Sequence, residues 1–273
     1  MQYETICLKE LYSCLRGGSL KVLCLDNPWG DGRAWARPAV IVVPGGAYAF
    51  VSKREGEPVA ANFLSAGYQV CVLEYLCSAD GASYPEQLFE LGCAVDYLKS
   101  NAERLHINPK EVFAVGFSAG GHLVADFANE HQTLKARTGL PIDASPAAVG
   151  LCYPVINDHD DSFDNLLCGY EGKEKAALKE ALKLNQTVGK QTPPTFLWTT
   201  AEDKLVPPHN TLDQALALSQ NGIPFECHVY PLGGHGKSNG SAEINDDAVG
   251  NDILSAWVKD MARFFRSFCV EKC

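Results

Sequence analysis

Short apolar runs alternate along the chain with longer stretches in which apolar residues recur at helical spacing. A continuous apolar run bounded by glycine or proline predicts a buried strand, and apolar residues three or four positions apart predict a helix with one packed face. On this basis we predict strands at 19–25, 39–46, 68–75, 112–117, 147–155, 195–200 and 225–232. Helices are predicted at 57–67, from Pro85 to about Leu105, and at 119–129, 211–222 and about 249–268.

This alternation of strands and helices predicts βαβ units, and therefore an α/β fold with a mostly parallel central sheet covered by helices on both faces. No internal repeat or low-complexity tract divides the chain, so we expect one domain over residues 1–273. The stretch 156–194 contains one predicted helix at about 173–184 and is too long for a simple connection. We interpret it as a lid-like insertion that covers the active-site edge of the sheet.

Composition narrows the class of protein. Of the 273 residues, 46% are hydrophobic and 21% are charged, which is typical of a soluble globular protein. The 23 Lys and Arg against 33 Asp and Glu give a net charge of −10, which argues against nucleic acid or an anionic membrane as a partner. The first residues lack the pattern of a signal peptide, and no apolar run is as long as a membrane span. We therefore expect a cytoplasmic protein.

The 11 cysteines are odd in number and scattered, and several lie in apolar segments. This usage favours reduced thiols over a disulfide framework. The pair Cys269 and Cys273 is interpreted as incidental, and the acidic run 158–161 ("DHDD") as a solvated loop. No metal and no organic cofactor are expected.

The sequence 116–120 ("GFSAG") places Ser118 between glycines, directly after a predicted strand and before a predicted helix. This is the context of a nucleophile elbow, in which a sharp turn leaves no room for side chains two residues on either side of the serine. A serine at that position is also an ordinary helix N-cap. The rest of the site has to decide between the two interpretations.

A serine nucleophile needs hydrogen-bond donors for the oxyanion that develops on the substrate. The backbone N–H of Ala119 is one candidate, and the turn 44–48 ("PGGAY") supplies one or two more. That turn also follows a strand of the predicted sheet, so it lies at the same edge as Ser118. Its alternative interpretation is a plain β-turn.

The nucleophile also needs a base, and His235 in "LGGHG" is the best placed of the seven histidines because it follows the last strand on a glycine-rich loop. His122 lies on the helix after Ser118 and is expected to point away from it. Asp203 follows the strand 195–200 and precedes His235 in the chain, as the orienting acid of such a fold should. Glu202 is its neighbouring competitor, and a turn role for Asp203 is the alternative.

Together, the stretches 42–75, 107–125, 151–156, 192–212 and 230–236 resemble the α/β-hydrolases of the esterase and lipase superfamily, and most closely the small bacterial acetyl esterases of xylan and other carbohydrates. The resemblance implies Ser118 as nucleophile, Asp203 as acid and His235 as base. It also implies an oxyanion hole at Gly46, Ala47 and Ala119. Where related lipases have H-G-G-G, this chain has P-G-G-A, and alanine keeps the backbone donor.

The resemblance further implies a small-molecule ester substrate with a short acyl group on a sugar or another small alcohol. Acetyl is the acyl group that the resemblance favours most. We expect Tyr48, Phe50 and Phe163 to form walls of its pocket. A formamidase or a serine peptidase would use the same triad, and a binding protein that has lost catalysis is a third alternative. The sequence leaves open whether the chain forms a homo-oligomer.

Overall fold

The computed structural model describes residues 1–29, 31–157, 159–245 and 251–270, without the side chains of 251 and 252. The described residues form an eight-stranded sheet in the order β1-β2-β4-β3-β5-β6-β7-β8. Its strands are β1 Gln2–Cys7, β2 Ser19–Cys24, β3 Arg37–Val43, β4 Gln69–Glu74, β5 Ile107–Phe117, β6 Ala148–Cys152, β7 Thr195–Thr200 and β8 Phe225–Tyr230. β2 pairs antiparallel with β1 and β4, and the pairs from β4 through β3 to β8 are parallel, as the alternating pattern predicts.

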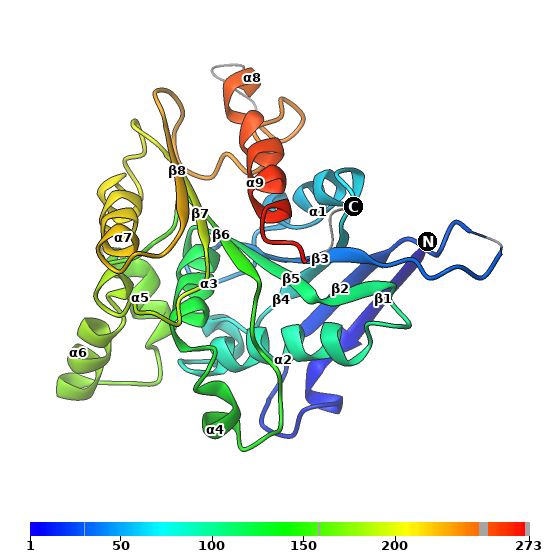
Figure 1. The fold of residues 1–273 in the computed structure, drawn as a ribbon. Coiled ribbons are helices and arrows are strands. Elements are labelled where there is room, and N and C mark those ends of the chain that lie inside the picture. Colours follow the sequence, from blue (N-terminus) through cyan, green and yellow to red (C-terminus); the bar gives the residue numbers. More distant parts are fainter. Residues whose placement is uncertain (30, 158, 246–250, 271–273) are drawn as a thin grey trace.

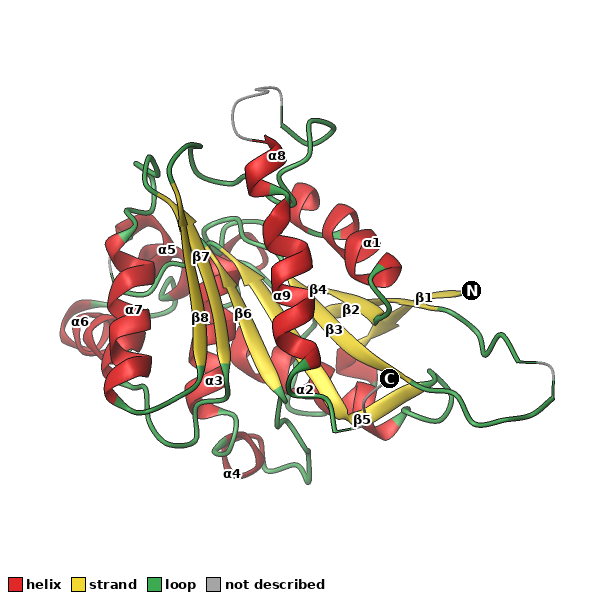
Figure 2. Ribbon diagram, turned by 45° about the horizontal axis from the view of Figure 1, so that its top comes forward, coloured by secondary structure: helices red, strands yellow, loops and turns green. Residues whose placement is uncertain are grey.

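Helices cover both faces of this sheet (Figures 1 and 2). α1 and α9 pack on one face, and α2, α3 and α7 on the other. The helices are α1 Glu57–Ser65, α2 Glu86–Ser100, α3 Ala119–Glu130, α4 Leu134–Thr138, α5 Asp160–Leu166, α6 Gly172–Ala181, α7 His209–Gln220, α8 Asn251–Leu254 and α9 Ala256–Arg266. Short 3₁₀ turns are η1 Leu8–Glu10, η2 Lys53–Glu55, η3 Ser78–Asp80 and η4 Leu184–Gln186.

The central strand β3 shows why its sequence is apolar without interruption. Successive side chains of a strand point to opposite faces, and here both faces are buried. Ile41 and Val43 belong to the apolar cluster under α2, α3 and α7, whereas Val40 and Val42 belong to the cluster under α1 and α9. The carboxyl ends of the parallel strands therefore meet at one edge, and their loops are free to carry chemistry.

Several elements differ from the sequence prediction. β1 was not predicted, because its half-exposed alternation at the sheet edge gives only a weak apolar signal. β5 begins at Ile107 and not at 112, since the mostly exposed stretch 108–110 continues the strand despite its proline. The short helices α4 and α5 were also not predicted. The last predicted helix is two described helices separated at Ser255, and residues 249 and 250 lie outside the described residues.

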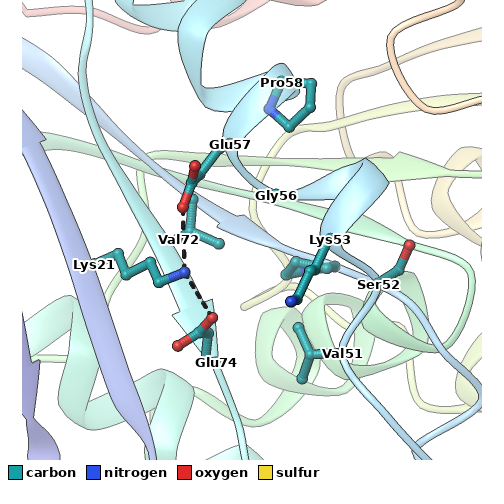
Figure 3. Close-up of a pocket in the computed structure, with 10 residues that line it drawn as sticks. Lys21, Val51, Ser52, Lys53, Gly56, Glu57, Pro58, Val72 and Glu74 are labelled. Atoms are coloured by element: carbon teal, nitrogen blue, oxygen red, sulfur yellow. Dashed lines mark hydrogen bonds and ion pairs between the residues drawn. The ribbon is translucent and has the colours of Figure 1, made fainter. Parts of the chain in front are cut away.

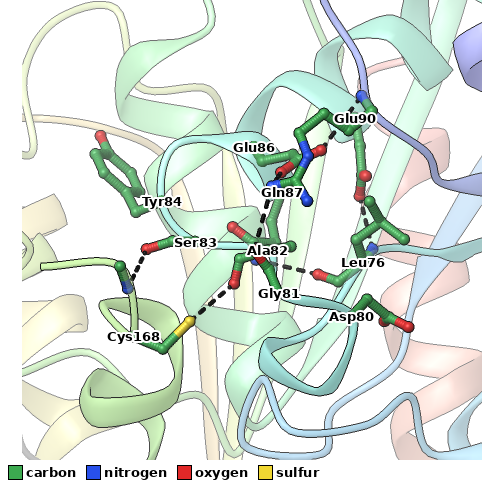
Figure 4. A network of polar contacts seen from close by, with 12 residues as sticks. Leu76, Asp80, Gly81, Ala82, Ser83, Tyr84, Glu86, Gln87, Glu90 and Cys168 are labelled. Carbon is green, nitrogen blue, oxygen red and sulfur yellow. Dashed lines mark hydrogen bonds and ion pairs between the residues drawn. The ribbon is translucent and has the colours of Figure 1, made fainter.

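The stretch 156–194 contains α5, α6 and η4 and is attached to the loop 76–86 by backbone and short polar contacts (Figure 4). Ser83 donates from its hydroxyl to the Leu166 carbonyl at 3.1 Å and accepts from the Gly169 N–H at 3.2 Å. The Cys168 thiol donates to the Ala82 carbonyl at 3.2 Å. These contacts hold α5 against the core, and the role of the segment as a lid stays a prediction.

No helix of the described residues is long and apolar enough to cross a membrane. All ten cysteines that the structure describes are free thiols, as their distribution predicts.

The buried Asp126 of α3 gives the fold a testable pH dependence. Burial raises the pKa of its carboxyl from 3.8 to about 7. The folded state therefore binds this proton more tightly than the unfolded state, and stability falls as the pH rises from about 4 to about 7. We expect Asp126→Asn, which cannot ionise, to lose less stability than the wild type between about pH 5 and pH 8.

Urea unfolding at several pH values measures this difference, with the exposed Asp161 as the site of a control substitution, Asp161→Asn. Parallel stability curves for the wild type and Asp126→Asn would contradict a raised pKa at Asp126.

Candidate active site

Ser118 lies at the junction of β5 and α3 and has a backbone φ of 52°, a conformation that costs energy for any residue other than glycine. This backbone conformation turns the chain sharply from strand to helix and brings the serine to the carboxyl edge of the sheet. Its N–H donates to the Cys152 carbonyl at 3.0 Å, and its carbonyl accepts from the Val155 N–H at 3.1 Å. The end of β6 therefore holds the turn in place.

The flanking glycines are required by close contacts. A Cβ at Gly116 would lie 2.2 Å from the Gly120 carbonyl oxygen, and a Cβ at Gly120 would lie 2.3 Å from the Pro44 carbonyl oxygen. A Cβ at Gly121 would lie 2.7 Å from the Pro154 side chain. Each distance is far inside van der Waals contact, so the glycine spacing of the motif is a consequence of packing around the turn.

The Ser118 side chain does not cap α3. Its hydroxyl oxygen lies 2.8 Å from Nε2 of His235. The geometry therefore matches a nucleophile and its base, and the N-cap interpretation is wrong for this side chain.

His235 is held between Ser118 and Asp203. Nδ1 lies 2.6 Å from Asp203 Oδ2, and a carboxylate only accepts, so Nδ1 carries the proton and Nε2 is free to accept from the serine hydroxyl. The Asp203 side chain is 1% exposed, and its second oxygen accepts from the N–H groups of Leu205 at 3.0 Å and Val206 at 2.9 Å. The competitor Glu202 instead accepts from the Gly233 N–H at 3.0 Å, in the loop before His235.

The turn 44–48 lies directly against this serine. A Cβ at Gly45 would be 2.9 Å from the Cβ of Ser118, and Gly46 and Ala47 have φ values of 127° and 52°. The Gly46 carbonyl accepts from the N–H groups of Ala49 and Phe50, which curls the loop. Within the described part of the chain, the N–H groups of Ala47 and Ala119 have no acceptor. Both donors are thus available, and their role as an oxyanion hole stays a proposal.

Of the three predicted pocket residues, only Phe50 has the exposed surface of a wall, at 62%. Tyr48 and Phe163 are each 1% exposed, which differs from the prediction, because both pack around His122. Tyr48 donates its hydroxyl proton to His122 Nδ1 at 2.8 Å, and His122 Nε2 donates to the Leu182 carbonyl at 3.1 Å. Burial lowers the pKa of His122 to about 4. His122 is therefore a neutral link between the turn 44–48 and the insertion.

Two residues of the site were missed by the sequence analysis. Glu55 in η2 is 4% exposed, and Tyr153 after β6 is 2% exposed. Their hydrogen bonds join the turn 44–48 to the loop of His235. Tyr153 follows the end of a parallel strand, which was a usable signal, whereas nothing in the local pattern marks Glu55 among its charged neighbours.

A pocket of about 490 Å³ lies between residues 51–58 and the strands β2 and β4 (Figure 3). Lys21 crosses it and pairs with Glu57 at 3.2 Å and Glu74 at 2.9 Å. Since Lys21, Glu57 and Glu74 pair with one another and neither Ser118, Asp203 nor His235 lines it, we assign no ligand to this pocket.

Among the described residues, no group of three or more His, Cys, Asp or Glu side chains is arranged to hold a metal ion. Asp158 of the acidic run and Cys273 of the terminal pair lie outside the described residues.

The chain is similar to known proteins over most of its length. It is 33% identical to endo-1,4-beta-xylanase B of Butyrivibrio fibrisolvens over 208 residues, covering 73% of this chain and 32% of that protein. It is 28% identical to acetylxylan esterase of Xylanibacter ruminicola over 254 residues, covering 89% of this chain and 49% of that protein. This chain thus spans about a third and about half the length of these two relatives.

A solved structure extends the similarity to nearly the whole chain. The acetyl ester-xyloside bifunctional hydrolase of Caldicellulosiruptor lactoaceticus is 29% identical, with a TM-score of 0.81 over 97% of this chain and 96% of that chain.

The sheet order, the elbow and this likeness define an α/β-hydrolase, which confirms the fold class and the resemblance seen in the sequence. A family model described as BD-FAE matches residues 30–218. The chain belongs to the BD-FAE family, and its relatives include carboxylic ester hydrolases.

The close approach of Gly120 to Pro44 predicts that Gly120 does not tolerate substitution by alanine. A glycine in the loop before His235 should tolerate the same substitution. Gly120→Ala would force its Cβ to within 2.3 Å of two backbone oxygens, so we expect a loss of about 1–3 kcal/mol or more in unfolding free energy and a fall in activity. Gly234→Ala meets no atom within 4 Å and is the matched control in the loop before His235. Urea unfolding compares them, and equal stability of the two variants would contradict the packing argument.

Proposed function

We propose that the chain is a serine esterase that cleaves acetyl esters of carbohydrates or of other small alcohols. The observation that carries the proposal is the chain of hydrogen bonds from Ser118 through His235 to Asp203, beside a glycine turn with free backbone donors. Separate loops at one edge of the sheet supply these groups. Neither a helix cap nor a plain turn requires all of them together.

In the proposed reaction, His235 Nε2 takes the Ser118 proton while the hydroxyl oxygen attacks the ester carbonyl carbon. The carbonyl oxygen becomes an oxyanion, which the N–H groups of Ala47, Ala119 and Gly46 would stabilise. Protonated His235 then gives its proton to the leaving alcohol, and an acyl-enzyme remains. A water molecule, deprotonated by His235, hydrolyses that ester and regenerates Ser118. Asp203 holds the imidazole in the required tautomer throughout.

The substrate class is supported by the relatives. One curated relative is named an acetylxylan esterase, and the name of one solved structure refers to an acetyl ester and to a xyloside. Because this chain spans only part of the curated relatives, the acetyl carbohydrate is our proposal for it and not a transfer of their activity. A net charge of −10 argues against nucleic acid as a partner. The free cysteines suit a cytoplasmic location, where short acetylated oligosaccharides are more accessible than polymeric xylan.

A formamidase or a peptidase would use the same three side chains, since the triad acts on any acyl carbon. Assays with an aryl formamide and a peptide amide separate these alternatives from the esterase.

Removal of the nucleophile tests the mechanism. We expect Ser118→Ala to lower kcat/KM for p-nitrophenyl acetate by about 10⁴-fold, because the attack on the carbonyl is lost. Ser219→Ala, at an exposed position of α7, is the control and should leave the rate unchanged. If Ser118→Ala retained wild-type activity, or if both proteins were inactive on all esters tested, the serine esterase would be excluded.

The acyl and alcohol preferences are tested separately. We expect faster hydrolysis of the acetate than of the butyrate or octanoate p-nitrophenyl ester. We also expect the wild type, and not Ser118→Ala, to release acetate from acetylated xylo-oligosaccharides. Faster hydrolysis of the octanoate ester, without release of acetate from the oligosaccharides, would be consistent with the triad. It would contradict the proposal that the substrate is an acetylated carbohydrate.

A further inference from the structure

Two loops must be aligned with Ser118 for this site to work, and they lie far apart in the sequence. One is the oxyanion loop, residues 44–52, and the other is the histidine loop, residues 233–240. The donors of the first have to meet the substrate oxygen, and the base on the second has to meet the serine hydroxyl. The structure contains a buried connection between them that the triad chemistry does not use.

The connection begins at Glu55, whose carboxylate accepts two hydrogen bonds inside the protein. Oε2 accepts from the Gly45 N–H at 2.8 Å, and Oε1 accepts from the Tyr153 hydroxyl at 2.7 Å. Gly45 is the residue whose Cβ, if present, would lie 2.9 Å from the Cβ of Ser118. The carboxylate therefore fixes the oxyanion loop where that loop touches the nucleophile.

Tyr153 continues the connection to the histidine loop. Its hydroxyl accepts from the Ser238 N–H at 2.9 Å, and its ring contacts the imidazole of His235 edge to face, with 5.0 Å between ring centroids. Burial raises the pKa of Tyr153 well above its usual value, so the hydroxyl keeps the proton that it donates to Glu55. Ser238 also donates its hydroxyl proton to the Arg54 carbonyl at 2.6 Å, beside Glu55.

We propose that Glu55 is a positioning residue of the active site, whose carboxylate, through Gly45 and Tyr153, holds the oxyanion loop and the histidine loop in alignment with Ser118. This inference rests on the proposed function. It assigns to Glu55 no contact with substrate and no proton transfer. Its effect is geometric, because a displacement of about 1 Å in an active site can lower the rate by about 100-fold.

The chemistry requires glutamate and not glutamine. A glutamine has one side-chain oxygen and can accept from Gly45 or from Tyr153, but not from both with separate oxygens. If its oxygen stays on Gly45, its NH₂ group faces the Tyr153 oxygen, and the tyrosine proton loses its acceptor. If the amide is reversed, its NH₂ group faces the Gly45 N–H, and two donors then oppose each other. Glu55→Gln therefore keeps the size of the side chain, and in either orientation of the amide one of the two hydrogen bonds that the carboxylate accepts is lost.

The kinetic test compares Glu55→Gln and Tyr153→Phe with the wild type on p-nitrophenyl acetate. We expect kcat to fall about 10-fold to 100-fold in both variants while KM changes less than about twofold, because the substrate pocket is intact and the reacting groups are misaligned. Glu57→Gln is the matched control, since Glu57 lies two residues away, is 57% exposed and pairs with Lys21 in the pocket between residues 51–58 and the strands β2 and β4 (Figure 3). Melting temperatures are measured for all variants, and rates are taken well below each of them.

A second measurement does not depend on activity. Hydrogen exchange followed by mass spectrometry should show faster exchange in Glu55→Gln in both 44–52 and 233–240, although the substitution lies in neither loop. Tyr153→Phe should expose the Ser238 amide, and Glu57→Gln should change neither loop.

The outcomes separate the two proposals. An active wild type whose kcat is unchanged by Glu55→Gln would overturn the positioning role. So would a loss of activity that disappears on cooling, or faster exchange in the oxyanion loop alone. A wild type inactive on every ester would refute the proposed function, and the exchange of the two loops would then decide whether Glu55 connects them.

Discussion

The contact between two backbone turns, 44–46 and 116–121, is the constraint on which the rest of the site depends. Gly120 approaches the Pro44 carbonyl oxygen, and Gly45 approaches Ser118, so closely that neither position has room for a Cβ. β3 and β5 are adjacent and parallel, which brings their carboxyl ends together and makes this contact possible. The Ser118 side chain and the backbone donors of the turn 44–48 lie side by side because these two turns touch.

The sequence was sufficient for the parts of the structure that depend on local pattern. Continuous apolar runs predicted the buried parallel strands, and chain order together with the glycine turns singled out Ser118, Asp203 and His235, which the structure brings together through hydrogen bonds. Elements with weak local signals were missed, such as the half-exposed edge strand β1. Two of the three expected pocket walls, Tyr48 and Phe163, are instead buried by packing around His122.

Glu55 shows what local pattern could not provide. It lies in a charged stretch, "SKREGE", where a solvated side chain is the ordinary expectation, yet it is among the buried charged residues of the chain. A buried carboxylate is tolerated only where donors satisfy it, and here one donor lies 10 residues away and the other 98 residues away. Long-range partners of this kind are visible only in the folded structure, because a single sequence does not reveal which segments meet.

The dispersion of the site along the chain has a consequence for folding. The turn 44–46, Ser118, Asp203 and His235 follow four different strands, β3, β5, β7 and β8, which together with β6 form one continuous part of the sheet. Such non-local contacts form late, when most of the loop-closure entropy has already been lost. A partly folded form of the chain in which one of these strands is not yet paired therefore lacks at least one of these groups, and assembly of the full site reports on completion of this part of the sheet.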